Sequence, residues 1–214
     1  MKITIRNEEI KDFSLVEEIT RKAFYNLYMP GCTEHYLVHI MRQHKDFISE
    51  LDFVIEIDGH IIGNIMYTKA KLRDEAGIEK EILSFGPLCM LPEYQRKGYG
   101  KILLEHSFEK ATKLGYDVIV VMGSPSNYLN RGFKSCKRHN ICMENGTFPT
   151  ALMVKELKID ALDGRKWTYH ESPVMHIDEQ AASYFDDKLE KMEKKYQSSQ
   201  EEFYVLSNSI LVEF

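Results

Sequence analysis

Hydrophobic and polar residues follow a different spacing in each part of the chain. Residues 2–7, KITIRN, alternate between apolar and polar side chains, which predicts a half-buried strand. Further on, apolar residues recur at helical spacing, at Leu15, Ile19, Ala23 and Leu27. This spacing predicts a helix that Asp12 or Ser14 caps, and a second helix is predicted over 33–48.

Strand-like runs dominate the middle of the chain. Residues 51–72 hold two apolar runs on either side of Asp58-Gly59, a pair that favours a tight hairpin turn. KEILSFGPLCM, at roughly 80–90, predicts a third strand, and the nearly continuous apolar run DVIVVM predicts a strand buried on both faces. Between them, an apolar stripe predicts an amphipathic helix over 100–114, ended by Gly115. Strand, helix and buried strand together predict a βαβ unit.

The spacing of apolar and polar residues is less regular toward the C-terminus. A short helix is predicted at 125–131, and strands are predicted near 134–143 and 151–158. The stretch TYHESPVMHIDE is expected to be irregular, and Asp178 is expected to cap a helix. The expected buried face of that helix consists of Ala181, Phe185, Leu189, Met192 and Tyr196. The final FYVLSNSILVEF is expected to add one more strand.

Composition places the chain among soluble globular proteins. Its 214 residues are 43% hydrophobic and 29% charged, enough for one domain of ordinary size with a small appendage. We therefore expect a domain over 1–158 and an extension over 159–214 that packs on the same domain.

Charge and cysteine content narrow the functional classes. The net charge of −5 weighs against nucleic acid as a partner, because phosphate binding favours a basic surface. The four cysteines form no CxxC pair, which favours reduced thiols. The N-terminus lacks an apolar leader and no run of 18 apolar residues occurs, so we expect no membrane partner and a cytoplasmic protein.

The stretch LPEYQRKGYGK, directly before the predicted helix 100–114, carries the chemistry that stands out most. Gly98 and Gly100 are costly near a helix unless the backbone there must remain accessible. A glycine pair at such a turn often serves geometry alone. Arg96, Lys97 and Lys101 could likewise form a solvated surface, but they lie at the end of the helix that repels cations, which favours a bound anion that offsets their charge. Free helix amides with these cations predict a di- or polyphosphate ligand on the turn.

The glycine turn resembles a known signature. Gln95-x-x-Gly98-x-Gly100 is similar to the acyl-CoA signature [QR]xxGx[GA] of the GNAT N-acetyltransferase superfamily. SPSNYLNRGF at 124–133 resembles the Tyr-x-x-x-Gly-Phe element of that family, and ALMVKEL resembles the closing strand of one bacterial branch. The resemblance extends over about residues 1–158.

This resemblance implies a fold and a cosubstrate. The fold would be α/β, with a mixed, mostly antiparallel central sheet that splays between strands 4 and 5 and is flanked by helices. The cosubstrate would be acetyl-CoA, with no metal. Its pyrophosphate would lie on Gln95, Arg96, Lys97, Gly98, Tyr99, Gly100 and Lys101. Its pantetheine arm would follow Leu88, Cys89 and Met90, with the Met90 amide near the thioester carbonyl. Gly86-Pro87 fits a bulge beside the splay.

The resemblance also implies a reaction, in which a primary amine of an unidentified acceptor attacks the acetyl thioester directly. Tyr128 matches the tyrosine that serves the family as proton donor to the leaving thiolate. The sequence departs from the family where a glutamate is often found, because position 84 is Ser84. The general base is therefore left open between Glu81, Glu93 and water.

The sequence also leaves other functions open. The protein could be a CoA-binding regulatory module without turnover, or could use a longer acyl-CoA. The acceptor, a small molecule or a peptide, is expected to meet a wall built by residues 26–48 and the C-terminal extension, and a homodimer through the amphipathic tail helix stays open. Metal binding by the pair His35 and His39 or by Cys136, His139 and Cys142 is disfavoured, because no further ligand is evident. Cys89 is expected to be a buried thiol and not a nucleophile.

Overall fold

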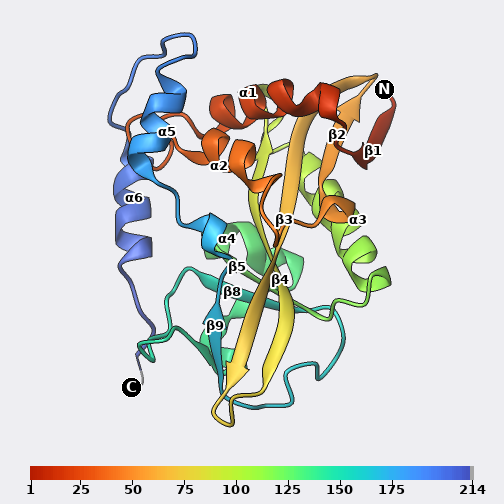
Figure 1. The fold of residues 1–214 in the computed structure, drawn as a ribbon, viewed down its shortest axis with the longest axis vertical. Helices are drawn as coiled ribbons and strands as arrows, with labels where there is room; N and C mark the ends of the chain where they lie inside the picture. Colours follow the sequence, from red (N-terminus) through yellow and green to blue (C-terminus); the bar gives the residue numbers. More distant parts are fainter. Residues whose placement is uncertain (213–214) are drawn as a thin grey trace.

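The structure is a computed structural model that describes residues 1–212. Within these residues a mixed sheet of nine strands forms the centre of the molecule, in the order β1-β2-β3-β4-β5-β8-β6, with β9 pairing to β3 and β7 (Figure 1). Its pairs are antiparallel except for β4 with β5 and β7 with β9. The strands are β1 (Ile3–Asn7), β2 (Phe53–Ile57), β3 (His60–Asp74), β4 (Glu79–Met90), β5 (Val118–Met122), β6 (Lys134–Ser135), β7 (Ile141–Cys142), β8 (Leu152–Glu156) and β9 (Trp167–His170).

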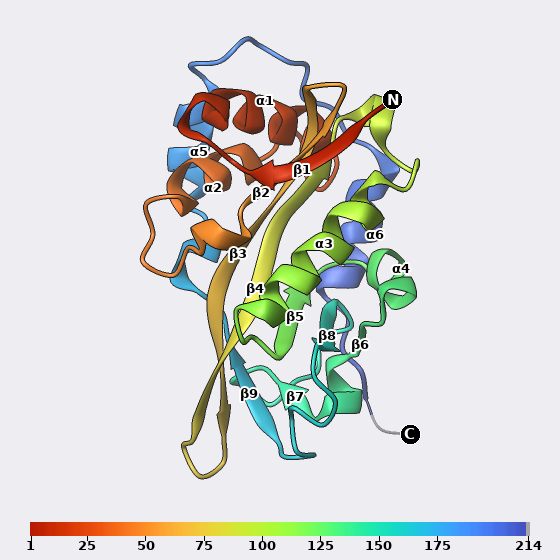
Figure 2. The same ribbon diagram turned by 90° about the vertical axis from the view of Figure 1, so that its right-hand side faces the viewer.

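Helices cover both faces of this sheet. Helices α1 and α2 lie on one face and α3 lies on the other (Figure 2). Alternation along β2 explains this, because Val54 belongs to the cluster under α1 and α2 while Ile55 belongs to the cluster under α3. The helices are α1 (Phe13–Phe24), α2 (Glu34–Met41), α3 (Tyr99–Lys113), α4 (Pro125–Tyr128), α5 (Glu179–Asp186) and α6 (Ser198–Ser207). Short 3-10 turns occur at Ile10–Asp12, Ser49–Leu51, Pro92–Tyr94, Leu129–Arg131, Cys136–His139 and Pro173–Met175.

The middle of the sheet opens between β4 and β5. Ile65 pairs with Leu88 and Tyr67 pairs with Phe85, so Gly86-Pro87 adds one extra residue to β4 at this point. β5 runs parallel to β4, with a single paired position, Leu83 with Ile119. Beyond it the two strands diverge. The predicted fold, with its bulge and its splay between strands 4 and 5, is therefore confirmed.

The stretch TYHESPVMHIDE, expected to be irregular, begins with residues 168–170 of β9, so the expectation is wrong for these residues, whereas 171–178 contain only the short turn Pro173–Met175. Trp167 and Tyr169 are buried, whereas the residues between and after them are partly exposed. β9 pairs with the far half of β3, from Lys71 to Asp74, next to the β4 hairpin. A strand of four residues is too short to show a recognisable alternation of apolar and polar side chains. This segment is a strand because it pairs with β3, a contact that its own sequence does not indicate.

The first two helices also differ in detail from their predictions. Val16, Ile19 and Thr20 form the buried face of α1, while Leu15 is 42% exposed. Asp12 does not cap α1 with its side chain, because its carboxylate binds the Arg6 guanidinium at 2.5 Å. α2 ends at Met41, short of the predicted end at 48, and Asp46 and Ile48 instead form backbone hydrogen bonds with β3, at 2.8 Å to Lys69 and 3.1 Å to Tyr67.

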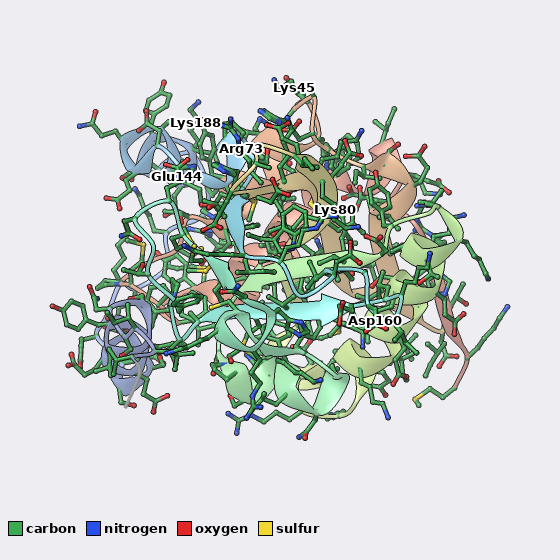
Figure 3. All side chains as sticks on the ribbon, turned by 90° about the horizontal axis from the view of Figure 1, so that it is seen from below. Lys45, Arg73, Lys80, Glu144, Asp160 and Lys188 are labelled. Atoms are coloured by element: carbon green, nitrogen blue, oxygen red, sulfur yellow. The ribbon has the colours of Figure 1, made fainter. Side chains whose placement is uncertain are left out.

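The C-terminal third departs further from expectation. The predicted strand 134–143 is interrupted by the turn Cys136–His139. Asp178 does cap α5, accepting from the Gln180 and Ala181 amides, but α5 stops at Asp186 before the last three residues of the predicted stripe. Residues 203–207, expected in a strand, belong to α6, and the last two residues of that expected strand lie outside the described residues. Around the molecule, charged side chains such as Lys45, Glu144 and Lys188 project outward (Figure 3).

Candidate active site

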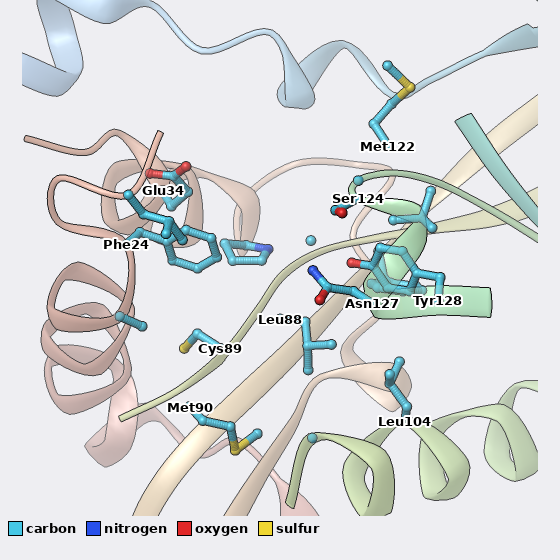
Figure 4. Close-up of a pocket in the computed structure, with 18 of the residues that line it drawn as sticks. Phe24, Glu34, Leu88, Cys89, Met90, Leu104, Met122, Ser124, Asn127 and Tyr128 are labelled. Atoms are coloured by element: carbon cyan, nitrogen blue, oxygen red, sulfur yellow. The ribbon is translucent and has the colours of Figure 1, made fainter. Parts of the chain in front are cut away.

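A cleft of about 590 Å³ lies where β4 and β5 part. Its floor is β4 from Ser84 to Met90, and one wall is the end of β5 with α4. The glycine turn closes one end, and the end of α1, the start of α2 and the segment 171–177 form the opposite side. Figure 4 shows Phe24 and Glu34 on one side and Ser124, Asn127 and Tyr128 on the other.

The glycine turn leads into α3. Gly98 has a φ of 90°, a left-handed conformation that glycine adopts without strain, and it stands at the N-cap of α3. A Cβ atom on Gly98 or on Gly100 would meet no protein atom within 4 Å. The Lys101 amide bonds back to the Gly98 carbonyl at 3.1 Å, so the amides just before it are free to bind an anion.

The side chains around this turn differ in their positions. Most of the residues predicted to contact the cosubstrate line the cleft, namely Leu88, Cys89, Met90, Gln95, Arg96, Gly98, Gly100 and Lys101. Lys97 and Tyr99 do not line it; the Lys97 ammonium lies 5.7 Å from the Tyr94 ring centre, and the Tyr99 hydroxyl faces Met1. The Gln95 side chain donates to the Met90 carbonyl at 3.1 Å, which ties the turn to the end of β4.

The end of β4 presents a free backbone edge to the cleft. The Leu91 amide donates to the Ile62 carbonyl of β3 at 2.8 Å. Amides alternate between the two edges of a strand, so the preceding Met90 amide points away from β3 and toward the opening. Cys89 faces the α1 side instead, where its thiol donates to Asn64 Oδ1 at 2.8 Å and burial raises its pKa to about 12. A thiol in that state is a poor nucleophile.

Tyr128 comes from the end of α4 and directs its hydroxyl into the cleft (Figure 4). Its ring packs against Phe85 and Phe133, with ring centres 5.7 and 5.4 Å away. Any Cβ at Gly123 would come within 2.6 Å of this ring, so the glycine makes room for it. Burial raises the pKa of Tyr128 above its ordinary value. The hydroxyl therefore keeps its proton and can act as an acid or a hydrogen-bond donor.

The carboxylates suggested as bases do not reach the cleft. Glu81 is exposed and pairs with Lys69 at 3.3 Å, and Glu93 is exposed on the turn. Two other carboxylates line the cleft, Glu34 at the start of α2 and Glu171 just after β9. Burial raises the pKa of both, chiefly through loss of hydration. Both lie in the segments expected to form the acceptor wall, 26–48 and the C-terminal extension, but neither belongs to a motif, so sequence reasoning did not single them out.

Histidines and cysteines elsewhere do not converge on a site for a metal. Among residues 1–212 no group of three potential ligands has the spacing to hold an ion. His35 is buried between the Cys32 thiol at 3.3 Å and Asp186 at 3.2 Å, while His39 faces Glu17. The Cys136 and Cys142 thiols donate to different backbone carbonyls.

The comparison with known families agrees with the site. Residues 21–133 match the model of the acetyltransferase (GNAT) family. The chain belongs to this family. The matched region contains the glycine turn, the β4–β5 opening and Tyr128, and it ends before β8, β9 and the C-terminal helices. Acyltransferase activity is thus the expected activity class. Within residues 1–212, no helix combines the length and the apolar character needed to cross a bilayer.

Individual relatives and solved structures share this family. The uncharacterized N-acetyltransferase YjhQ of Escherichia coli K12 is 25% identical over 126 residues, which cover 58% of the chain and 66% of that protein. The E. coli GNAT protein YhbS, solved with CoA, superposes with a TM-score of 0.70 at 23% identity, covering 83% of this chain and 93% of YhbS. A GNAT acetyltransferase of Brucella melitensis, solved with acetyl-CoA, gives 0.63 at 21% identity, covering 81% and 98%.

Proposed function

We propose that this protein is a cytoplasmic N-acetyltransferase that transfers the acetyl group of acetyl-CoA to a primary amine. The observation that carries the proposal is the cleft itself, in which free helix amides, an unpaired strand edge and the Tyr128 hydroxyl face one space. The acceptor is a small molecule or a peptide. Two GNAT structures with similar folds were solved with CoA and acetyl-CoA, which supports the choice of cosubstrate.

We assign the cosubstrate to two neighbouring stretches of the chain. The pyrophosphate would lie on the amides from Arg96 to Lys101, with the Arg96 and Lys101 side chains adding positive charge. The pantetheine arm would follow the free edge of β4 from Leu88 to Met90, where its amides can replace the missing strand partner. The absence of any Cβ at Gly98 and Gly100 leaves room for phosphate oxygens at the backbone.

Two groups of the chain would assist the chemical step. Acetyl-CoA supplies a thioester carbonyl for attack by a neutral amine, with CoA leaving as a thiol. The Met90 amide would donate to the carbonyl oxygen as negative charge develops there. The Tyr128 hydroxyl would give its proton, or a hydrogen bond, to the departing sulfur. The proton lost by the amine would pass to a carboxylate or to water in the cleft.

Calorimetric titration with acetyl-CoA tests the proposal first, with NAD and ATP as control ligands. We expect selective binding of acetyl-CoA, and release of CoA thiol when primary amines are added. Binding without thiol release with any amine would favour a CoA-binding module, and tighter binding of a longer acyl-CoA would change the donor. No binding of any acyl-CoA would refute the proposal.

A variant of the glycine turn sharpens this test. Gly100→Val adds a side chain where the protein has open space and an ordinary backbone conformation, so the fold should be retained. The side chain would occupy the place assigned to phosphate, so acetyl-CoA affinity should fall by about tenfold or more. Thr112→Val, an isosteric change on the exposed side of the same helix, is the matched control and should bind normally.

A further inference from the structure

The cleft has opposite charge at its two ends. Arg96, Lys101 and the N-terminus of α3 make the end at the glycine turn positive. Glu34 and Glu171 line the other side. Within residues 1–212 neither carboxylate has a lysine or arginine at ion-pair distance; Glu34 accepts from the Thr33 amide at 3.0 Å, and Glu171 lies 3.5 Å from the exposed His176. A polyanionic cosubstrate would balance the positive charge at the glycine turn, but it would leave Glu34 and Glu171 without a positively charged partner.

Aromatic side chains accompany the two carboxylates. Phe24 and Tyr28 line the same side of the cleft, with ring centres 5.8 Å apart. Tyr28 is held in place from behind by Phe203 of α6, stacked at 4.5 Å. Phe24 and Glu34 face Tyr128 across the cleft (Figure 4). Aromatic faces beside carboxylates are the environment that organic cations favour, since the ring quadrupole and the carboxylate both attract positive charge.

The segment that carries Glu171 lies against the reacting edge of the sheet. β9 pairs with β3, and Glu171 follows it directly. Further along this segment, Met175 Cε lies 3.5 Å from the place where a Cβ on Gly86 would be. Met175 therefore lies over β4 at Gly86, and Glu171, Met175 and Ile177 of this segment line the same cleft as Met90. An acceptor held at these carboxylates would have an amine within the same cleft as Tyr128.

Resting on the proposed function, we infer that the acceptor is an amine that carries a second positive charge and no carboxylate, held by Glu34 and Glu171 against Phe24 and Tyr28. The attacking amine must lose its own charge before it reacts, so a second cation keeps the electrostatic attraction through the reaction. The proton it loses passes to one of these carboxylates and then to water. A carboxylate on the acceptor would face like charges and be excluded.

A four-carbon series of amines tests this inference with purified full-length protein. Thiol release from acetyl-CoA is measured with 1,4-diaminobutane, 1-aminobutane and 4-aminobutanoate, which differ only in the group at the far end. We expect kcat/KM to be about tenfold higher for the diamine than for 1-aminobutane, and turnover of 4-aminobutanoate to be the lowest. Equal or better use of 1-aminobutane or 4-aminobutanoate would overturn the inference and leave the proposed function standing.

Variants of the two carboxylates test the inference through the preference for diamine over monoamine, which a general loss of activity or stability would not change. Glu34→Gln and Glu171→Gln should each reduce the ratio of kcat/KM between diamine and monoamine toward one, with the KM for acetyl-CoA unchanged. Glu81→Gln, which lies outside the cleft, should keep the ratio of the parent protein. An unchanged ratio in both cleft variants would overturn the inference.

Binding alone gives an independent result. Calorimetric titration of 1,4-diaminobutane into the protein saturated with CoA should show binding that weakens in the two cleft variants. No diamine binding to the CoA complex would refute the inference. Failure of CoA itself to bind would instead refute the proposed function, so the two failures are distinguishable.

Discussion

Tyr128 combines two properties at the scale of a single residue, a packed ring and a hydroxyl that faces the cleft. Tyr128→Phe keeps the ring contacts with Phe85 and Phe133, so acetyl-CoA affinity and stability should change little. The loss of the proton donor should lower kcat on the order of 100-fold. Tyr116→Phe, at the far end of the sheet from the glycine turn, serves as the control. An unchanged kcat in Tyr128→Phe would remove the residue from the mechanism.

The protonation state of Tyr128 gives a second expectation. An acid loses activity as pH rises through its pKa, and burial moves the pKa of Tyr128 upward from its ordinary value. The alkaline limb of the kcat profile should therefore not begin below about pH 10 on its account. The profile is measured with saturating amine. A limb near pH 8 that disappears in Tyr128→Phe would contradict this expectation.

Residues differ in how far their position could be foreseen. Gly98, Gly100 and Tyr128 belong to local motifs, so they could be predicted as site residues from the sequence alone. In the structure all three line the same cleft. Glu34 and Glu171 are about 140 residues apart and share the cleft only because β9 pairs with β3. Single-chain periodicity contains no information about such a pairing, so their two segments were expected beside the acceptor but the individual carboxylates could not be predicted.

At the scale of elements, a buried ion pair fixes α5 to α1. Arg21 Nε donates to Asp186 Oδ1 at 2.7 Å, and both side chains are about nine-tenths buried. Asp186→Asn leaves the Arg21 charge uncompensated, so the free energy of unfolding should fall by about 3 kcal/mol. Asp187→Asn, one residue later and exposed, should leave it unchanged. Urea unfolding of both variants measures the difference, and equal effects would show that the buried pair contributes nothing.

The elements that were predicted correctly share strong local signals. The hairpin of β2 and β3 turns at Asp58-Gly59, where Asp58 and Gly59 both have positive φ, and α3 ends before Gly115 with a φ of 92°. β9 and α6 have no comparable signal. Phe203 in α6 packs on Tyr28, a contact with a distant residue that no spacing within α6 could indicate.

At the scale of the whole molecule, we propose that residues 1–158 and 159–214 form one folding unit. Trp167 and Tyr169 of β9 are buried in the same cluster as Leu72 and Ile82 of the central sheet. A chain ending at residue 158 would expose that cluster and leave one edge of β3, from Lys71 to Asp74, unpaired, because β4 pairs only with the other edge. It should show no cooperative thermal unfolding, whereas the full chain should. A truncated chain that unfolds as cooperatively as the full protein would refute the proposal.

Asn26 shows how the extension is held along its length. Its side chain donates to the Glu193 carbonyl at 2.9 Å and accepts from the Lys195 amide at 3.1 Å, and its carbonyl accepts from Gln200 at 2.9 Å. The residues that bind the extension thus directly precede Tyr28 in the loop after α1. The side of the cleft assigned to the acceptor is supported from behind by the end of the chain.

The pairing of β9 with β3 has a consequence for synthesis on the ribosome. Lys71 pairs with His170, roughly 100 residues later in the chain, so the edge of β3 opposite β4 stays open during translation until β9 has been made. An open strand edge in a nascent chain invites contact with other chains. Lys71 and Arg73 alternate with buried Leu72 along this edge. Lysine and arginine on an open strand edge disfavour its pairing with another chain, so we expect these two residues to protect the edge until β9 emerges.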